Sequence, residues 1–144
     1  MKYIKFLSFA FALPFIACQG QSISNTIATT DNSTKIELID FYGTHRCVTC
    51  VSIEANAKYT IETYFQDAVK DGKLAFKTVN VDEEMNYGIA ERFEATGTAL
   101  FMNIIKDGTE QHIDLTNFAF SNGMDKEKFS TELKSKLEEQ LKRL

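Results

Sequence analysis

Two cysteines separated by two residues, Cys47 and Cys50 in the segment Cys-Val-Thr-Cys, are the groups in this sequence best suited to chemistry. A thiolate is both the nucleophile of disulfide exchange and a ligand for soft metal ions, so this spacing alone fits either use. A bridge across so short a loop restricts the unfolded chain only slightly and adds little stability. We therefore expect the pair to serve chemistry rather than scaffolding.

Charged residues stand beside the cysteine pair. Arg46 adds a permanent positive charge next to Cys47, and His45 adds another when it is protonated. Positive charge of this kind favours a thiolate. Glu54 follows Cys50 by four residues, which places both on one face of a helix. We interpret Glu54 as a solvated helix residue, with proton transfer to the dithiol as the alternative.

The elements that must position the pair follow from local patterns. Runs rich in β-branched and aromatic residues predict four strands, at 35–42, 73–81, 99–105 and 110–115. Helical spacing predicts three helices, at 48–71, 82–94 and from about 125 to the C-terminus. Asp82 is expected to cap the second helix, Gly72 to end the first, and Asp107-Gly108 to form a hairpin turn. The segment between 115 and 125 is expected to be a loop.

The resulting order, βαβαββα, predicts an α/β fold with a four-stranded mixed sheet and helices on both faces. In this order Cys47 lies at a turn from a strand into a long helix. The free amides and the positive end of the helix dipole stabilise a thiolate at such a position. Cys50, one turn further along, can then resolve a mixed disulfide formed at Cys47.

This combination resembles the thioredoxin superfamily over residues 35–144. Asp40-Phe41-Tyr42 stands where thioredoxins have Asp-Phe-Trp, with one additional residue before Cys47. The resemblance implies that Asp40 is buried under the dithiol and moves protons for Cys50. It also implies that the redox-active Cys47–Cys50 disulfide is itself the working group, with no separate cofactor.

The sequence departs from thioredoxins at one position that contacts their substrates. Thioredoxins place a cis-proline opposite the dithiol, whereas the only proline here is Pro14 and the matching segment is Gly97-Thr98-Ala99. A cis bond before a residue other than proline costs about 2.5–4 kcal/mol, so we expect trans bonds throughout this segment. We expect Thr98 and His45 to contact the substrate, on a surface shaped differently from that of general thioredoxins.

A narrower resemblance involves the segment from Arg46 to Glu54. It is similar to the Arg-Cys-x-Thr-Cys-x-x-Ile-Glu segment of small secreted proteins that form the thioredoxin-like subunit of nitrophenyl-compound (aromatic nitro-arsenical) reductase systems. This resemblance implies that the dithiol passes electrons to a partner protein or a nitro compound, or that it holds a trivalent arsenical.

Metal binding is the alternative use of the same residues. Cys47, Cys50 and His45 together fall short of a closed four-ligand zinc site, but they suit a soft ion of low coordination number. His112, on the predicted fourth strand, is interpreted as an exposed strand residue rather than a ligand.

The N-terminus predicts export from the cytoplasm. Residues 1–17 combine two lysines with an apolar run too short to span a bilayer, as in a signal peptide. They end before Cys18 as in a bacterial lipoprotein, which predicts lipidation of Cys18, with plain cleavage as the alternative. Residues 18–34 are expected to be a flexible tether and 35–144 a thioredoxin-like domain.

These expectations also concern location and partners. We predict a membrane-anchored, extracytoplasmic protein, on the periplasmic side, that exchanges electrons with a thiol or disulfide partner. Because that compartment is oxidising, a reducing role would require a membrane electron donor. The net charge of −4, without a basic run, argues against nucleic acid as a partner.

Overall fold

The computed structural model describes residues 34–144, which contain one four-stranded sheet. The strand order is β2-β1-β3-β4, with bounds β1 Lys35–Tyr42, β2 Leu74–Asn80, β3 Ala99–Lys106 and β4 Thr109–Asp114. β1 pairs in parallel with β2, whereas the β1–β3 and β3–β4 pairs are antiparallel. The predicted mixed sheet is therefore confirmed. The expected signal peptide and Cys18 lie outside the described residues, as does most of the expected tether.

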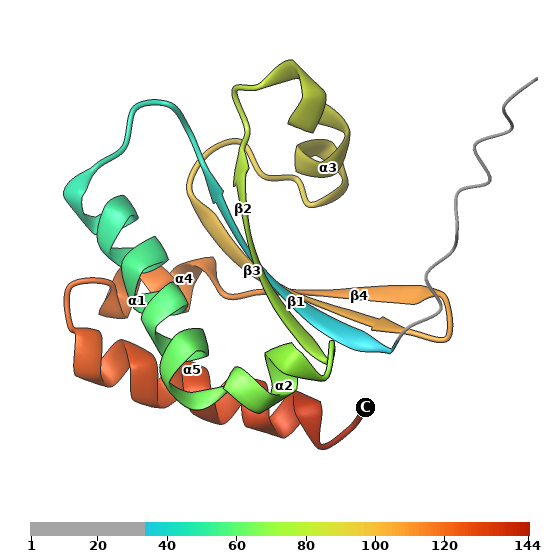
Figure 1. The fold of residues 1–144 in the computed structure, drawn as a ribbon. Helices are drawn as coiled ribbons and strands as arrows, with labels where there is room; N and C mark the ends of the chain where they lie inside the picture. The colour runs from blue at the N-terminus through green and yellow to red at the C-terminus, as the bar shows by residue number, and fades with distance from the viewer. Residues whose placement is uncertain (1–33) are drawn as a thin grey trace, which may run out of the picture.

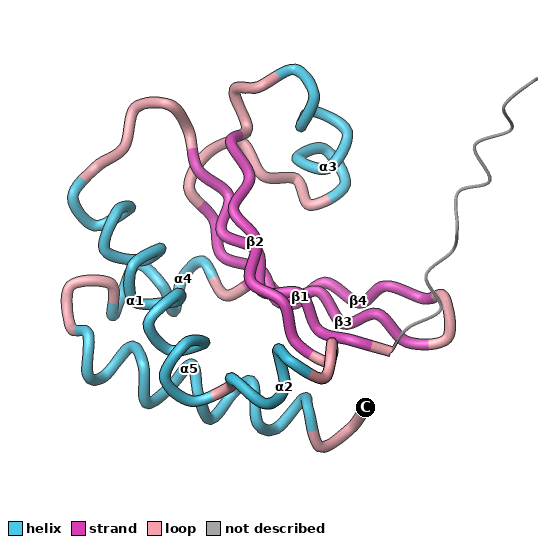
Figure 2. Tube along the Cα trace, in the orientation of Figure 1, coloured by secondary structure: helices cyan, strands magenta, loops and turns pink. Residues whose placement is uncertain are grey.

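Helices cover both faces of the sheet, as predicted (Figures 1 and 2). One face carries four of them, α1 Val48–Tyr64, α2 Gln66–Lys70, α4 Thr116–Asn122 and α5 Lys126–Leu141. The other face carries α3 Tyr87–Arg92, which follows a short 3₁₀ helix, η1 Glu84–Asn86. Within residues 34–144, no helix has the length and apolar character needed to cross a membrane.

The central strand β1 contributes side chains to two hydrophobic cores, one on each face of the sheet. Ile36 and Leu38 are completely buried in the core beneath α1 and α5, while Ile39 and Phe41 are completely buried in the core beneath α3. Side chains alternate between the two faces of a strand, so Asp40 shares the α1 face with Ile36 and Leu38. The sheet thus directs a carboxyl group toward the helix that begins at the cysteine pair.

The first helix is interrupted where the sequence predicts continuity. It ends at Tyr64, and Phe65 leaves the helical conformation with φ −127° before α2 begins at Gln66. Phe65 is only 5% exposed and packs in the α1–α5 core. Burial of this side chain offsets the loss of helical continuity. Gly72 ends α2 with φ +71°, as expected.

Two further local predictions are wrong. Asp82 does not cap a helix; its carboxylate accepts a hydrogen bond from the distant backbone N–H of Thr44 at 2.6 Å, and η1 begins only at Glu84. The segment predicted as a loop after β4 contains α4, whose first N–H, at Thr116, donates to Asp114. At seven residues, α4 is too short to give a clear periodic signal.

Candidate active site

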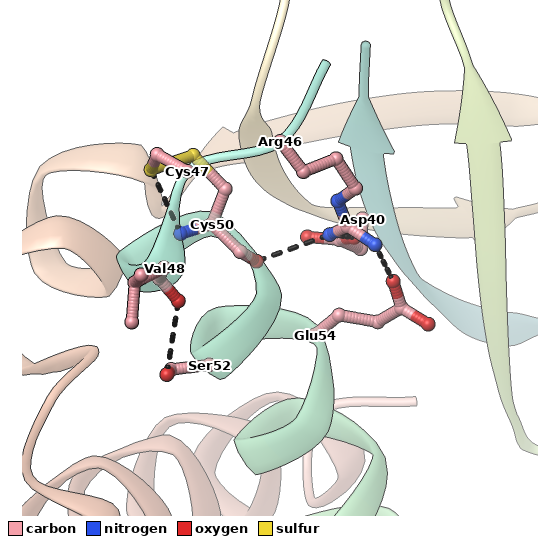
Figure 3. Close-up of polar contacts among 7 residues, drawn as sticks. All are labelled: Asp40, Arg46, Cys47, Val48, Cys50, Ser52 and Glu54. Carbon is pink, nitrogen blue, oxygen red and sulfur yellow. Dashed lines mark hydrogen bonds and ion pairs between the residues drawn. A yellow bond between two sulfur atoms is a disulfide. The ribbon is translucent and has the colours of Figure 1, made fainter. Parts of the chain in front are cut away.

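A disulfide links Cys47 to Cys50 at the start of α1, with the two Cα atoms 5.0 Å apart. β1 ends at Tyr42, and a short loop leads to Cys47, which is the N-cap residue of α1 and has an extended backbone. The Cys50 backbone N–H donates a hydrogen bond to the Cys47 sulfur at 3.0 Å (Figure 3). The sulfur therefore occupies the position in which a capping side chain satisfies a free helix amide.

The two cysteines differ in accessibility. Cys47 is exposed, whereas Cys50 is only 8% exposed and packs toward the interior. No acidic side chain lies in the first turn of α1 to compete with negative charge on Cys47. Cys47 is consequently the sulfur that another molecule can reach, and the helix terminus favours its thiolate.

Arg46 turns its guanidinium toward the sheet and helix. Nη2 donates to Asp40 Oδ2 at 3.3 Å and to the Cys50 carbonyl at 3.0 Å, while Nη1 binds the Glu54 carboxylate (Figure 3). The guanidinium carbon also lies 4.6 Å from the centre of the Tyr42 ring. Arg46 thus joins the loop before the disulfide to both β1 and α1.

Asp40 is completely buried, and burial raises its pKa from 3.8 to about 7. The positive charge of Arg46 lowers this pKa, whereas the negative charge of Glu54 raises it. Oδ2 accepts from Arg46, while Oδ1 has no hydrogen-bond partner among the described residues. Asp40 is therefore a carboxyl group that can exchange a proton near neutral pH, with one oxygen free to do so.

Glu54 has a role that its sequence position does not reveal. Its side chain is 30% exposed, and its carboxylate binds Arg46 instead of pointing freely into solvent. Glu54, interpreted from the sequence as a solvated helix residue, is thus partly exposed and paired with Arg46. Its placement on the same helical face as Cys50 brings it into the polar cluster formed by Arg46 and Asp40.

The two residues expected to contact a substrate lie on segments near the ends of β1 and β3. His45 is exposed in the loop before Cys47. The pKa of Asp82 is lowered mainly by hydrogen bonds from Thr44 and, to a smaller extent, by the charge of His45. Thr98 is half-buried and directly precedes β3, whose Ala99 pairs with Phe41 of β1. The peptide bonds of the segment Gly97-Thr98-Ala99 are trans, as expected, since residues 34–144 contain no cis peptide bond.

Sequence reasoning missed two contributions to the site. Tyr42 lies under the Arg46 guanidinium, and Asp82 holds the loop before the disulfide through Thr44. The signal that could have drawn attention to Tyr42 is its position directly after Asp40-Phe41, where thioredoxins have a tryptophan.

No group of three or more His, Cys, Asp or Glu side chains within residues 34–144 is arranged to hold a metal ion. The sulfur atoms of the proposed ligands Cys47 and Cys50 are joined to each other. His112 is an exposed residue of β4, as predicted; its ring stacks on Phe93 with centroids 3.8 Å apart, and Nε2 lies 3.2 Å from Glu110.

The strand order, together with a disulfide at the start of the helix after the central strand, decides the fold. This chain has a thioredoxin fold. Thioredoxin from Fasciola hepatica is 20% identical, with a TM-score of 0.43 over 79% of this chain and 85% of that one. Mitochondrial thioredoxin 3 from Saccharomyces cerevisiae, in its oxidised form, is 24% identical, with a TM-score of 0.41 over 64% of this chain and 78% of that one. No protein-family model and no curated protein matches the sequence.

Proposed function

We propose that this protein is a thiol–disulfide oxidoreductase in which Cys47 attacks and Cys50 resolves. The observation that supports this assignment is the disulfide between an exposed and a buried cysteine at the N-terminus of the 17-residue helix α1. A small-loop disulfide at this position contributes little to stability, whereas the helix terminus lowers the cost of forming a thiolate.

The exchange follows from these positions. In the reduced protein, the Cys47 thiolate attacks one sulfur of a partner disulfide, forming a mixed disulfide and releasing the partner's other sulfur as a thiolate. Cys50 loses its proton and attacks the Cys47 sulfur, which forms the Cys47–Cys50 bond and releases the second partner thiolate. Two electrons pass to the partner, and the reverse sequence reduces this protein.

Asp40 is proposed as the group that takes the proton from Cys50. Its Oδ2 atom and the Cys50 carbonyl both bind Nη2 of Arg46, so the carboxyl lies next to the backbone of the resolving cysteine. The free Oδ1 atom can accept the proton, and a pKa of about 7 suits proton transfer in either direction at neutral pH.

Exchange with glutathione tests this proposal. The full-length Cys18→Ser variant, which retains only Cys47 and Cys50, is equilibrated with mixtures of reduced and oxidised glutathione and trapped by alkylation. We expect a two-electron transition, abolished in Cys47→Ser and in Cys50→Ser. Absence of exchange at every glutathione ratio would overturn the proposal. Stoichiometric bound metal, lost in Cys47→Ser, would instead favour a soft-metal or arsenical binding protein.

The proposed setting is extracytoplasmic, on a lipid anchor at Cys18. The apolar segment before Cys18 supports it. Mass spectrometry of the mature chain is expected to find a lipidated Cys18 as its first residue, in the membrane fraction. A soluble mature chain without lipid would exclude the anchor. A reducing role there would depend on a membrane electron donor.

We further propose that the dithiol serves a dedicated partner or substrate, such as a nitroaromatic or arsenical reduction system. Two features support specialisation: the segment Gly97-Thr98-Ala99 stands where thioredoxins have the proline that faces the dithiol, and the segment from Arg46 to Glu54 resembles such a subunit. The test compares oxidation of the reduced protein by an aromatic nitro-arsenical and by insulin disulfides, and measures arsenite affinity. Rapid insulin reduction with no response to either arsenical would favour general disulfide reduction.

A further inference from the structure

One guanidinium group serves two carboxylates beside the disulfide. Arg46 Nη2 lies 3.3 Å from Asp40 Oδ2, and Nη1 binds Glu54 (Figure 3). The arginine side chain is 19% exposed, Asp40 is fully buried, and Glu54 is 30% exposed. Screening by water is therefore weak at Asp40 and stronger at Glu54.

The charges in this cluster do not balance when both carboxyl groups are ionised. One positive and two negative charges then leave a net charge of −1. The charge on Asp40 is the unfavourable one, because this carboxyl is buried and desolvation disfavours its ionised form. With Asp40 protonated, Arg46 and Glu54 form a neutral pair. The more exposed Glu54 can keep its charge, so the proton belongs on Asp40.

We propose that Glu54 is a positioning residue for the dithiol: by binding Arg46, it prevents that guanidinium from holding Asp40 permanently as a carboxylate. Asp40 can then both take a proton from Cys50 and return it. Without Glu54, the whole charge of Arg46 would act on Asp40 and make it a weak base. This inference rests on the proposed exchange function and assigns the control of its proton step.

Within the described part of the chain, two charged groups act on Asp40. They are Arg46, from the loop, and Glu54, from α1. Its partners on the neighbouring strands are Thr78 of β2 and Leu100 of β3, which carry no charge. The further titratable groups near this cluster are Tyr42, whose ring lies against the Arg46 guanidinium, and, in the reduced protein, the two cysteine thiols.

The first test follows the Asp40 carboxyl carbon by ¹³C NMR as a function of pH in the oxidised, full-length protein. Glu54→Gln keeps the shape of the side chain and removes its charge, so we expect the midpoint of Asp40 to fall by about one pH unit, a tenfold change. Arg46→Gln should raise the midpoint by a similar amount. Opposite shifts of the Asp40 midpoint in the two variants indicate a charge effect. Simple loosening of the site would shift the midpoint in the same direction in both variants.

Two matched variants complete the test. Glu62→Gln removes another α1 carboxylate, which pairs with Lys58 on the exposed surface, and is expected to leave Asp40 unchanged. Glu54→Asp retains the charge and should restore most of the wild-type titration. If Glu54→Gln does not fold, Glu54→Asp should change the Asp40 midpoint little and Arg46→Gln should raise it. A midpoint that Arg46→Gln leaves unchanged or lowers would then overturn the inference.

The second test measures the dithiol midpoint potential against pH in glutathione buffers. The slope should change near the Asp40 midpoint, and this break should move to lower pH in Glu54→Gln. An unchanged Asp40 midpoint in Glu54→Gln would overturn the inference, as would a shifted midpoint with an unchanged potential profile. Failure of the wild-type dithiol to exchange would overturn the proposed function instead, while the Asp40 shifts measured in the oxidised protein would still report the Glu54–Arg46 interaction.

Discussion

The backbone N–H of Cys50 points at the sulfur of Cys47, 3.0 Å away, so Cys47, the proposed attacking thiol, caps the helix that contains Cys50. Reduction leaves the same amide free to stabilise a thiolate on Cys47. Solvent exposure and the helix terminus therefore both favour reaction at the Cys47 sulfur, and this leads to the first prediction.

Cys47 should react far faster than Cys50 with an alkylating reagent. In the reduced Cys18→Ser protein we expect iodoacetamide at neutral pH to modify Cys47 at least about tenfold faster, because Cys47 is exposed and capped by an amide while Cys50 is buried. Peptide mapping after brief alkylation gives the ratio, and unfolding in urea serves as the control that should equalise the two rates. Equal rates in the folded protein would contradict the assignment of Cys47 as the nucleophile.

Asp40→Asn should stabilise the oxidised protein at alkaline pH. Burial raises the pKa of Asp40 from 3.8 to about 7, so the protonated form is favoured by folding. The stability from this group is complete below pH about 4, and is lost as pH rises through about 7. Asparagine never ionises, so the variant should gain about 2–3 kcal/mol over the wild type between pH 5 and pH 8.5.

Urea unfolding at several pH values measures this difference. The matched control is Asp71→Asn at the exposed end of α2, which should run parallel to the wild type over the same range. If the difference between Asp40→Asn and the wild type does not change with pH, Asp40 does not titrate in the folded protein as described.

Asp82→Asn should loosen the loop that carries the disulfide. The carboxylate accepts the Thr44 N–H at 2.6 Å, and these hydrogen bonds lower the pKa of Asp82. The contribution of Asp82 is therefore present at neutral pH and lost as pH falls through its lowered pKa. Amide exchange should accelerate at Thr44 in the variant, with little change in the core strand β1. Unaltered exchange at Thr44 would show that the loop is held by other contacts.

Gly123→Ala should destabilise the junction between α1 and the α4–α5 turn. A methyl group at this position would lie 2.9 Å from the Ala119 carbonyl oxygen and 3.0 Å from side-chain atoms of Ile53 and Thr49. We expect a loss of about 1–3 kcal/mol in the free energy of unfolding, because a packed interface must shift. Urea denaturation provides the measurement.

Gly88→Ala is the matched control for that substitution. Gly88 lies in α3, and a methyl group there meets no atom within 4 Å. Since alanine favours a helix more than glycine does, stability should rise by up to about 1 kcal/mol. Equal effects at both positions would mean that general backbone entropy, rather than packing at Gly123, decides the outcome.

Much of the fold is predictable because its signals are local. The buried row Phe129, Leu133 and Leu137 follows helical spacing, and the Asp107-Gly108 turn takes positive φ values at both residues, as the hairpin pattern predicts. The position of the cysteine pair at a strand-to-helix turn is likewise predicted by the local patterns on either side of it. These features depend on residues a few positions apart, so the sequence by itself determined the strands, the positions and order of the main helices among them, and the identity of the dithiol.

Tertiary structure decided the features that depend on distant partners. The first helix breaks at Phe65 because this side chain packs in the core. Asp82 does not cap a helix, since its carboxylate accepts a hydrogen bond from the Thr44 amide, 38 residues away. The direction of the Arg46 side chain is the clearest case. Sequence adjacency places its charge beside Cys47, but Asp40 and Glu54 hold the guanidinium, because hydrogen bonds and the attraction between opposite charges are stronger where water is largely excluded.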